Sequence, residues 1–385
     1  MKTNEQLLRE NKAWATETLN KVSEKMAEIA VRSREKLPYG YDENGMHIDM
    51  GKTMPDFWTN GFFGGSCAML YMHTKNEEFF KTLESTEKLL DNAFESKFES
   101  LHHDVGFMWH ITSGIKHKLT NDIASRKRIF YAASTLMSRF VLGGNFIRAW
   151  NEKRAYNWTI IDSLMNLPLL YYASEIFDDD RYKRIAMAHA DIALRTHLRQ
   201  DGSVIHIVEH DRDTGDTVKT HSGQGYQDGS SWSRGQAWAL YGFALSYKYT
   251  GEKRYLEASK RVANYFISAC SSDWLPRLDF RAPDEPIYYD STAGAIASAG
   301  LLELGRILPE YEGGLYSDAA INILKAMTEK FVNFNPATDD ILGFGSEAYP
   351  NNPDFTPKTN VPIIYGDFFY IESLMKMLDK SFMIW

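Results

Sequence analysis

An aspartate inside an apolar run is the first residue of this sequence that points to chemistry. Asp162 lies in the stretch IDSLMNLPLL, residues 161–170, for which we predict a helix over 158–176. A lone ionised carboxylate in apolar surroundings is costly, so Asp162 must be paired, hydrogen-bonded, protonated or directed into a cavity. Burial would raise its pKa, which suits a general acid at neutral pH. The alternative is a buried aspartate that caps a neighbouring helix.

A second aspartate follows two histidines. Asp104, in the segment LHHDVGF at 101–107, stands at the expected start of a helix over 104–118. Most aspartates at such positions only accept hydrogen bonds from the first helical turn. The adjacent His102 and His103 favour a functional role, although histidine pairs are also ordinary at protein surfaces.

Polar and aromatic residues gather before a third helix, expected over 233–250. The segment QGYQDGSSWSRGQAW at 224–238 places Arg234 and Trp238 at the helix start. A cation there opposes the helix dipole, so we expect Arg234 to grip a carboxylate through both of its terminal nitrogens. Trp238 would add a stacking face. Trp58, in PDFWTNGFFGG at 55–65, fits a sugar-stacking platform and a packed helix start equally well.

Several familiar kinds of site have no counterpart in the sequence. It contains no Walker A loop, HExxH, CxxC or strand-associated GxGxxG motif. Cys67 and Cys270 are too few and too far apart for a disulfide framework or a zinc site. We therefore expect neither a metal nor a cofactor.

Helical periodicity dominates the chain and must position these residues. Residues 203–209 and 216–220 are expected to be two strands of a small β-hairpin that is carried in a loop. The helices pair through short turns such as 177–181 and 249–253, and six such hairpins predict a closed ring with the odd-numbered helices inside. The expected helices are 8–37, 59–73, 76–97, 104–118, 121–140, 158–176, 179–198, 233–250, 252–270, 290–308, 314–333 and 364–380, and the expected strands are 203–209, 216–220 and 340–344.

Composition and charge limit the classes of partner. The 385 residues are 44% hydrophobic and 14% aromatic, which excludes a disordered or collagen-like chain. A formal charge of -8 gives no long-range attraction to nucleic acid or to an anionic membrane. No window approaches the roughly 18 uncharged apolar residues of a membrane span. Without a Pro- or Ser-rich linker or a signal-peptide core, we expect one domain over 1–385 in a cytoplasmic protein.

Six motifs together resemble the unsaturated glucuronyl hydrolases, family 88 of the glycoside hydrolases. The resemblance runs in order from about residue 55 to 378 and implies an all-α (α/α)6 barrel, in agreement with the six hairpins. The motifs are WTNGFFGG at 58–65, HHDVGF at 102–107, IDSLMNLPLL at 161–170, SSWSRGQAWALYGF at 230–243, DSTAGAIASAGLLEL at 290–304 and YGDFFYIESL at 365–374.

The resemblance also implies a substrate and a reaction. The substrate class is oligosaccharides left by polysaccharide lyases, such as unsaturated disaccharides from chondroitin, hyaluronan or heparin. These carry a 4,5-unsaturated uronic acid at the non-reducing end. The implied reaction hydrates the C4=C5 enol ether, and the resulting hemiketal opens and expels the next sugar.

Individual residues take roles from the same resemblance. Asp162 matches the general acid and base, and Asp104 the second essential aspartate, which orients or stabilises the reacting sugar. His206, Gln224 and Arg234 match polar contacts to the unsaturated uronate.

Aromatic and loop positions complete the expected site. Trp58 and Trp238 match stacking positions, and Trp150 is a weaker match because the loop before Asp162 is poorly anchored. The stretch 345–360 departs most from the family pattern. Lys358 there could bind a sulfate group with Thr356 or Thr359, and a solvated loop lysine is the equal alternative.

Three other functions stay open at this point. One is an unsaturated rhamnogalacturonyl hydrolase of family 105, although its helix-start motif reads more like RGNGW than SRGQAW at 233–238. The second is a sugar epimerase on the same barrel, with His206 and His221 as acid and base. The third is a non-catalytic carbohydrate binder. We expect a monomer or a homodimer.

Overall fold

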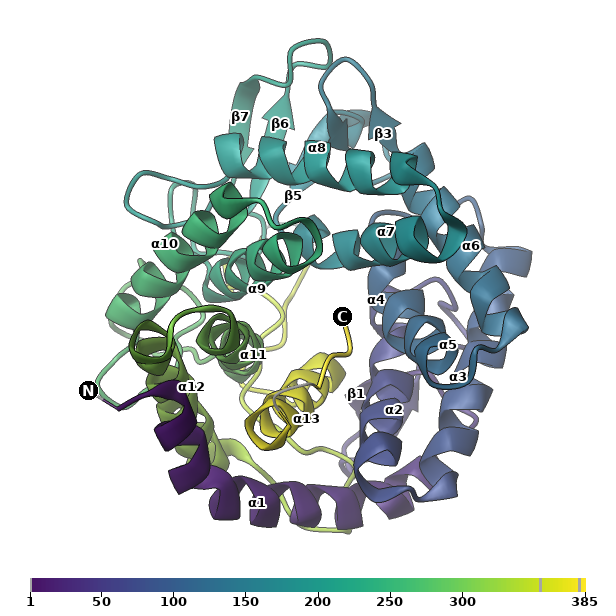
Figure 1. The fold of residues 1–385 in the computed structure, drawn as a ribbon, viewed down its shortest axis with the longest axis vertical. Helices are drawn as coiled ribbons and strands as arrows, with labels where there is room; N and C mark the ends of the chain where they lie inside the picture. The colour runs from purple at the N-terminus through teal and green to yellow at the C-terminus, as the bar shows by residue number, and fades with distance from the viewer. Residues whose placement is uncertain (1, 353–354, 380–381) are drawn as a thin grey trace.

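The chain folds into an inner and an outer set of helices around one axis (Figure 1). The structure is a computed structural model that describes residues 2–352, 355–379 and 382–385. The outer helices are α1 (Asn4–Arg32), α3 (Glu77–Ser96), α6 (Ile123–Ser138), α8 (Asp180–Thr196), α10 (Lys253–Ala269) and α12 (Glu310–Phe331). The inner helices are α2 (Phe62–Thr74), α4 (Val105–Trp109) continued by the π-turn η2 (His110–Gly114) and α5 (Ile115–Thr120), α7 (Ser163–Phe177), α9 (Ser233–Thr250), α11 (Ser291–Ile307) and α13 (Ile364–Leu378).

The predicted helical hairpins are confirmed. Each of the first five inner helices leads into its outer neighbour through a short turn, as between α7 and α8 or between α9 and α10. The sixth pair joins the two ends of the chain, because α13 packs against α1. This closure makes the all-α (α/α)6 barrel that was expected.

The expectation that the odd-numbered helices lie inside was wrong. Every residue of α9 from Ser233 to Ser246 is buried, whereas α10 buries only one face. A helix enclosed on all sides must be apolar or small all round, and a surface helix is amphipathic. The even-numbered helices of the twelve meet the first requirement and therefore form the inner ring.

The predicted helix over 158–176 begins later than expected. Trp158–Ile160 form the strand β5 and α7 starts at Ser163, so Asp162 is the residue that precedes the helix rather than one inside it. β5 pairs antiparallel with β6 (Ile207–His210), and β6 pairs with β7 (Thr217–His221). The β6–β7 hairpin confirms the predicted one, and β5 adds a third strand.

Other differences are local. Residues 340–344 form no strand in the described chain beyond the isolated bridge between Val332 and Leu342. The helix expected over 364–380 ends at Leu378, and its last expected residue lies outside the described residues. Two short antiparallel ribbons were not expected: β1 (Pro38–Tyr41) with β2 (His47–Asp49), and β3 (Phe140–Val141) with β4 (Phe146–Ile147).

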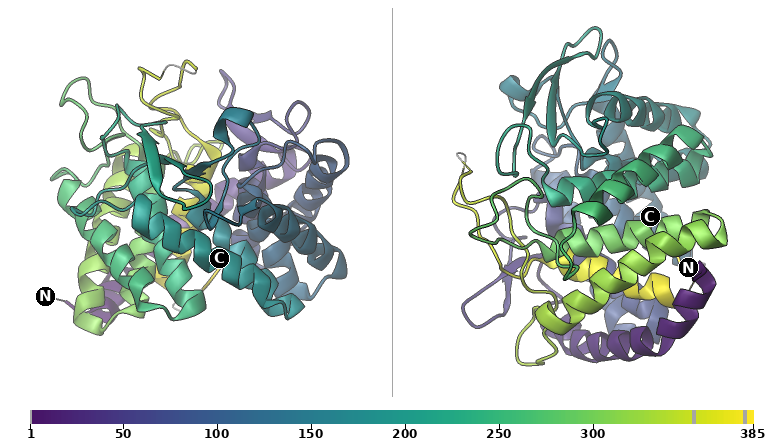
Figure 2. Two further views of the ribbon diagram at one scale, coloured as in Figure 1. Left: turned by 90° about the horizontal axis from the view of Figure 1, so that it is seen from above. Right: turned by 90° about the vertical axis from the view of Figure 1, so that its left-hand side faces the viewer.

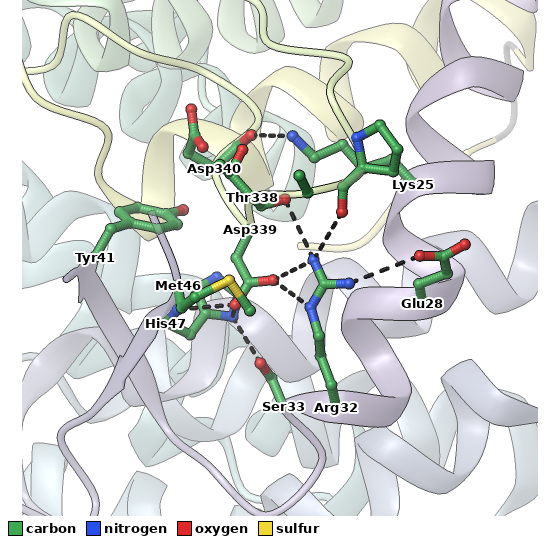
Figure 3. A network of polar contacts seen from close by, with 12 residues as sticks. Lys25, Glu28, Arg32, Ser33, Tyr41, Met46, His47, Thr338, Asp339 and Asp340 are labelled. Carbon is green, nitrogen blue, oxygen red and sulfur yellow. Dashed lines mark hydrogen bonds and ion pairs between the residues drawn. The ribbon is translucent and has the colours of Figure 1, made fainter. Parts of the chain in front are cut away.

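A polar network fixes the β1–β2 ribbon to the helices (Figure 3). The buried carboxylate of Asp339 accepts hydrogen bonds from Nε of Arg32 on α1, at 2.6 Å, and from the backbone N–H of His47 on β2, at 2.8 Å. The Tyr41 hydroxyl donates to Asp367 on α13 at 2.7 Å. The ribbon is thus bound both to the outer and to the inner ring.

The long connections gather at one end of the barrel (Figure 2). Each long connection precedes an inner helix, and the short turns follow the inner helices. The N-termini of the inner helices therefore converge at the loop-bearing end, where their partial positive charges add. None of the described helices is long and apolar enough to span a membrane.

Candidate active site

Asp104 and Asp162 hold the same position on two neighbouring inner helices. Asp104 is the N-cap residue of α4 and Asp162 that of α7, and neither side chain accepts a capping hydrogen bond. Asp104 is buried, and the side chain of Asp162 is 15% exposed. Both carboxylates therefore lie at positive helix ends without serving as caps.

His103 joins the two carboxylates. Its Nε2 atom lies 3.2 Å from Oδ1 of Asp104 and 3.2 Å from Oδ1 of Asp162. Asn166 in the first turn of α7 donates to Oδ1 of Asp104 at 3.4 Å and accepts from the backbone N–H of Phe107 at 3.0 Å. The fold thus brings together the two residues expected to be catalytic.

The surroundings of Asp104 and His103 shift the pKa of both groups. Burial raises the pKa of Asp104 to about 7, and the nearby charge of Asp162 acts in the same direction. Burial opposes a charged His103, but the Asp104 and Asp162 carboxylates raise the pKa of His103 overall. A carboxyl group with a pKa near 7, such as that of Asp104, is suited to holding and releasing a proton at neutral pH.

The small sheet places His206 beside Asp162. The backbone N–H of Ile161 donates to the His206 carbonyl at 3.0 Å. Nδ1 of His206 lies 3.0 Å from the Ser222 carbonyl oxygen and 3.1 Å from the backbone nitrogen of Gln224. Nε2 is buried and has no hydrogen-bond partner among the described residues. Burial lowers the pKa of His206 to about 4, so the ring is neutral at physiological pH.

Arg234 is buried and engaged with the protein. Nη1 pairs with Oδ2 of Asp290 at 2.5 Å and donates to the Ser346 carbonyl at 2.7 Å. Nη2 donates to the Glu347 carbonyl at 2.8 Å, and Nε2 of Gln224 donates to the same carbonyl at 2.6 Å. Asp290 thus supplies a carboxylate for Arg234, but only Nη1 contacts it, so the expected grip through both terminal nitrogens is wrong for this pair. The contact of Arg234 with a substrate remains a prediction.

The two expected stacking residues differ in exposure. Trp58 is half-buried, with its ring centre 5.1 Å from that of Tyr365 and 5.5 Å from that of Phe107. Trp238 is only 1% exposed and packs against Phe107 at 5.2 Å and Phe369 at 5.4 Å. Protein atoms therefore cover the stacking face expected of Trp238, while part of Trp58 remains exposed.

Trp150 borders an open groove beside the aspartates. The groove has a volume of about 670 Å³ and is also lined by His102 and Asp56. The ring of Trp150 meets that of His103 edge-on, with 5.9 Å between the ring centres. Because it is partly exposed, Trp150 is better placed than Trp238 to stack on a sugar.

Lys358 lies away from the aspartates, at a second groove of about 350 Å³. Its backbone N–H donates to Oε2 of Glu347 at 2.8 Å, and its side chain is exposed. The same groove is lined by Asp42, Glu43 and Asp340. Residues 353 and 354 of the variable stretch around Lys358 lie outside the described residues.

One cluster has the composition of a metal site. The possible ligand atoms of His102, His103 and Asp104 lie within 4.8 Å of one another. However, Nδ1 of His103 lies 2.7 Å from the Ala149 carbonyl, and Nε2 faces two carboxylates at hydrogen-bonding distance. A proton accounts for this geometry, and we assign no metal to it.

Comparison with known families decides what this arrangement belongs to. The family model described as Glycosyl Hydrolase Family 88 matches residues 30–273. The chain belongs to glycoside hydrolase family 88. An unsaturated glucuronyl hydrolase from Bacillus sp. (strain GL1) is 34% identical over 332 residues, which cover 83% of this family 88 chain and 86% of the relative. An unsaturated chondroitin disaccharide hydrolase from Streptococcus pneumoniae is 29% identical and covers 85% and 83%.

Solved structures agree with the family assignment. The crystal structure of the Bacillus sp. GL1 unsaturated glucuronyl hydrolase superposes on this family 88 enzyme with a TM-score of 0.87 at 30% identity, covering 94% of this chain and 96% of the other. A mutant of the Streptococcus agalactiae unsaturated glucuronyl hydrolase complexed with dGlcA-GalNAc6S gives a TM-score of 0.81 at 25% identity, covering 96% and 93%.

Three residues of the family 88 site were missed or undervalued in the sequence. His103 was noted only as a neighbour of Asp104, although the HHD triplet was its signal. Asn166 carried a signal too, since it stands four residues after Asp162 and so shares its helix face. Asp290 was read only as a helix start, and its pairing with Arg234 depends on the packing of α9 against α11.

Proposed function

We propose that this family 88 enzyme removes the 4,5-unsaturated uronic acid from the non-reducing end of lyase-generated glycosaminoglycan oligosaccharides. The observation that supports this most is the pair of Asp104 and Asp162, held by one histidine at the N-termini of two inner helices. A relative that is 34% identical over 332 residues is itself an unsaturated glucuronyl hydrolase.

The reaction is the hydration of an enol ether. Asp162 gives a proton to C4, and water adds at C5 while its own proton passes to the Asp162 carboxylate. The hemiketal formed at C5 then opens and expels the next sugar without attack at the anomeric carbon. The carboxylate separation that distinguishes retaining from inverting glycosidases therefore does not predict the outcome here.

The other residues bind and orient the uronate. Asp104 orients the reacting sugar. Nε2 of His206 is buried, has no hydrogen-bond partner among the described residues, and would be satisfied by a sugar oxygen. Gln224 and Arg234 bind the uronate from one side of the site, where both side chains donate a hydrogen bond to the Glu347 carbonyl. Trp58 and Trp150, which are both partly exposed, form the aromatic wall, and Trp238 lies buried against Phe107 and Phe369.

An acidic enzyme that binds an acidic sugar needs local attraction. The chain carries a formal charge of -8, and the charge of Arg234 is balanced by Asp290. The convergent N-termini of α4, α7, α9 and α11 supply partial positive charge at the loop-bearing end. We propose that these helix ends attract the uronate carboxylate together with the Arg234–Asp290 pair.

The alternative reactions are separable by assay. An unsaturated rhamnogalacturonyl hydrolase would prefer rhamnose-linked fragments when both substrate types are offered. An epimerase needs His206 and His221 to face one another. However, Nδ1 of His206 lies beside the Ser222 carbonyl, and the ring of His221 lies against that of Trp158, tilted by 31° with 4.4 Å between the ring centres. A non-catalytic binder would leave every unsaturated disaccharide intact.

Loss of the near-ultraviolet absorbance of the 4,5-double bond tests the proposal. We expect Asp162→Asn to lower kcat on an unsaturated chondroitin or hyaluronan disaccharide by about 10²–10⁴-fold, the share usual for a general acid. Asp179→Asn is the matched control, because Asp179 is the N-cap of the outer helix α8 and Asn caps equally well. Unchanged turnover by Asp162→Asn would exclude Asp162 as the acid.

Lys358 is the proposed contact for a sulfate on the second sugar. Four carboxylates share its groove, those of Asp42, Glu43, Asp340 and Glu347, so one ammonium would have to overcome their repulsion of a sulfate. We therefore expect Lys358→Ser to change kcat/KM for a sulfated disaccharide by less than about tenfold, and for an unsulfated one not at all. A panel of chondroitin, hyaluronan and heparin disaccharides measures both effects.

The proposal extends to the cellular setting, the domain organisation and the assembly. Cys67 and Cys270 are unpaired, which suits the reducing cytoplasm. We propose one catalytic domain over 1–385, because the largest buried apolar cluster draws on helices all round the ring. Cell fractionation and size-exclusion chromatography, which distinguishes a monomer from a homodimer, test these points.

A further inference from the structure

The ring of His103 is fixed by its other nitrogen. Nδ1 lies 2.7 Å from the Ala149 carbonyl, and a carbonyl can only accept, so Nδ1 carries a hydrogen. The same carbonyl accepts a hydrogen bond from Nη2 of Arg139 at 3.0 Å. Arg139 also donates to the Leu101 carbonyl and to Asn151, which ties the His103 loop to the loop that carries Ala149.

Nε2 of His103 therefore faces both carboxylates with only two possible states. It either carries a second hydrogen or presents a lone pair to Oδ1 of Asp104 and Oδ1 of Asp162, each 3.2 Å away. A lone pair between two ionised carboxylates is repelled by both, whereas an N–H is attracted by both. Burial of His103 at 1% exposure leaves little water to relieve that repulsion.

We propose, on the basis of the proposed function, that His103 is a positioning residue that stores the catalytic proton on Nε2 between turnovers. The proton passes from Nε2 to Oδ1 of Asp162, and Asp162 delivers it to C4 of the sugar. The water that adds at C5 gives its proton to the Asp162 carboxylate, from which it returns to Nε2. One water is consumed, and the site regains its starting proton count.

Other charged and titratable groups act on His103 from several elements. Arg139 follows α6 at its C-terminal end, His102 precedes His103, His189 lies on α8, and His206 precedes β6. Burial lowers the pKa of His102 well below its usual value, that of His189 to about 3 and that of His206 to about 4, so these rings are neutral at pH 7. The two aspartates and Arg139 are thus the charges that set the state of His103.

The protonation state of His103 can be measured without any substrate. We expect the ¹⁵N signals of the intact enzyme to show a hydrogen on both ring nitrogens of His103 at pH 7. In Asp162→Asn, which removes one of the two carboxylate charges, Nε2 should lose its hydrogen at a lower pH. An unprotonated Nε2 throughout pH 6–8 would overturn the proposal, whatever the activity of the enzyme.

Two substitutions separate proton storage from packing. His103→Gln keeps an N–H that can reach the carboxylates but cannot give up its proton, and His103→Asn keeps only the donor to the Ala149 carbonyl. We expect both to lower kcat by about 10²-fold with KM within about threefold. The acid limb of the kcat profile should also move to higher pH, because loss of the neighbouring cation raises the pKa of Asp104.

His189→Asn is the matched control. His189 is buried and accepts the backbone N–H of Ile147 at 3.0 Å, a bond that Asn can replace. This control should keep the wild-type pH profile. Wild-type kcat and pH limbs in His103→Gln, with Asp162→Asn inactive, would overturn proton storage alone, whereas an active Asp162→Asn would overturn the proposed function itself.

Discussion

Arg234 and Asp290 form a buried ion pair, 2.5 Å from Nη1 to Oδ2, between the first turn of α9 and the N-cap of α11. Oδ1 of Asp290 also accepts the backbone N–H of Thr292, so one carboxylate caps α11 and holds the arginine. The pair fastens two inner helices together at the end of the barrel that carries Asp162. Arg234 therefore serves the architecture of the site as well as any substrate.

Asp290→Asn should lower the free energy of unfolding by about 3–5 kcal/mol, because it leaves the guanidinium buried without a countercharge. Asn still caps α11, so the loss reports on the charge rather than on the cap. Urea denaturation at pH 7 measures it. The double substitution with Arg234→Met should cost less than the sum of the two single ones, and strict additivity would contradict a direct coupling.

Arg234→Met should mainly raise KM, since a carboxylate contact present in both ground and transition states is lost. The design compares KM for an unsaturated disaccharide in the wild-type and in the Asp290→Asn background. If Arg234 touches the uronate, KM rises in both backgrounds. A fall in kcat with KM unchanged would mean that Arg234 only positions other groups.

Gly106→Ala should displace Asp104 and Asp162 relative to each other by forcing apart the two helices that they precede. A Cβ at Gly106 would lie 2.6 Å from Oδ1 and 2.8 Å from Cα of Asn166, and the second contact is with the backbone of α7. α4 and α7 must then separate, and a displacement near 1 Å at a catalytic group costs about 10²-fold in rate. Gly40→Ala is the control, because no atom of the described residues lies within 4 Å of its added Cβ, and it should behave as wild type in kcat and in thermal unfolding.

The helices of the barrel could be predicted from the sequence. The strand β5 could not, because the residues that pair with it lie far away along the chain. Asp162 looks helical because WTIIDSLMNLPLL is apolar throughout, a pattern that does not distinguish a short strand from a helix start. The β-branched Thr159 and Ile160 become a strand because Val208 and Ile207 pair with them from nearly fifty residues away. The change moves Asp162 from the interior of a helix to its positive end.

The site was predicted where a residue's chemistry is conspicuous within its own segment. Asp104, Asp162 and Arg234 qualified in this way, whereas His206 was implied only by the family resemblance, and the fold gathers all four at one end of the barrel. His103 gains its role from the Ala149 carbonyl, 46 residues away, and Trp238 loses an open face to Phe107 and Phe369. Neither relation is visible without the packing of the inner ring.

Buried neutral histidines should make the fold sensitive to acid. Burial lowers the pKa of His189 to about 3 in the folded chain, against about 6.5 when unfolded. Its contribution to stability is therefore complete above about pH 6.5 and is lost as the pH falls toward the folded-state value. His47 and His206, each at about 4, and His197, at about 3, act in the same direction.

His189→Asn tests this dependence. Below pH 6.5, one such histidine lowers the free energy of unfolding by about 1.4 kcal/mol per pH unit. The loss of unfolding free energy between pH 7.5 and 5 should therefore be smaller in the variant. Urea denaturation at the two pH values gives both losses. An equal loss in wild type and variant would show that His189 does not titrate on unfolding.

Asp339→Asn should loosen the β1–β2 ribbon that borders the site. Asp339 is fully buried, and Arg32, 29% exposed at its side chain, is its ionic partner (Figure 3). Removing the charge should lower the unfolding free energy by about 3 kcal/mol, toward the lower end for buried pairs because Arg32 is partly hydrated. Glu28→Gln is the control, since Glu28 is 69% exposed and 3.7 Å from Arg32, and it should change stability by less than about 0.5 kcal/mol.

Asp339→Asn should also weaken substrate binding, because the β1–β2 ribbon carries Tyr39. Tyr39 lies on β1, and its hydroxyl donates to Oε1 of Glu347 at 2.7 Å, while the Glu347 carbonyl accepts from both Arg234 and Gln224. A looser ribbon should therefore raise KM with little change in kcat. Tyr39→Phe, which removes only the hydroxyl, should raise KM in the same direction without the loss of stability. If KM is unchanged in both variants, the ribbon has no part in binding the uronate.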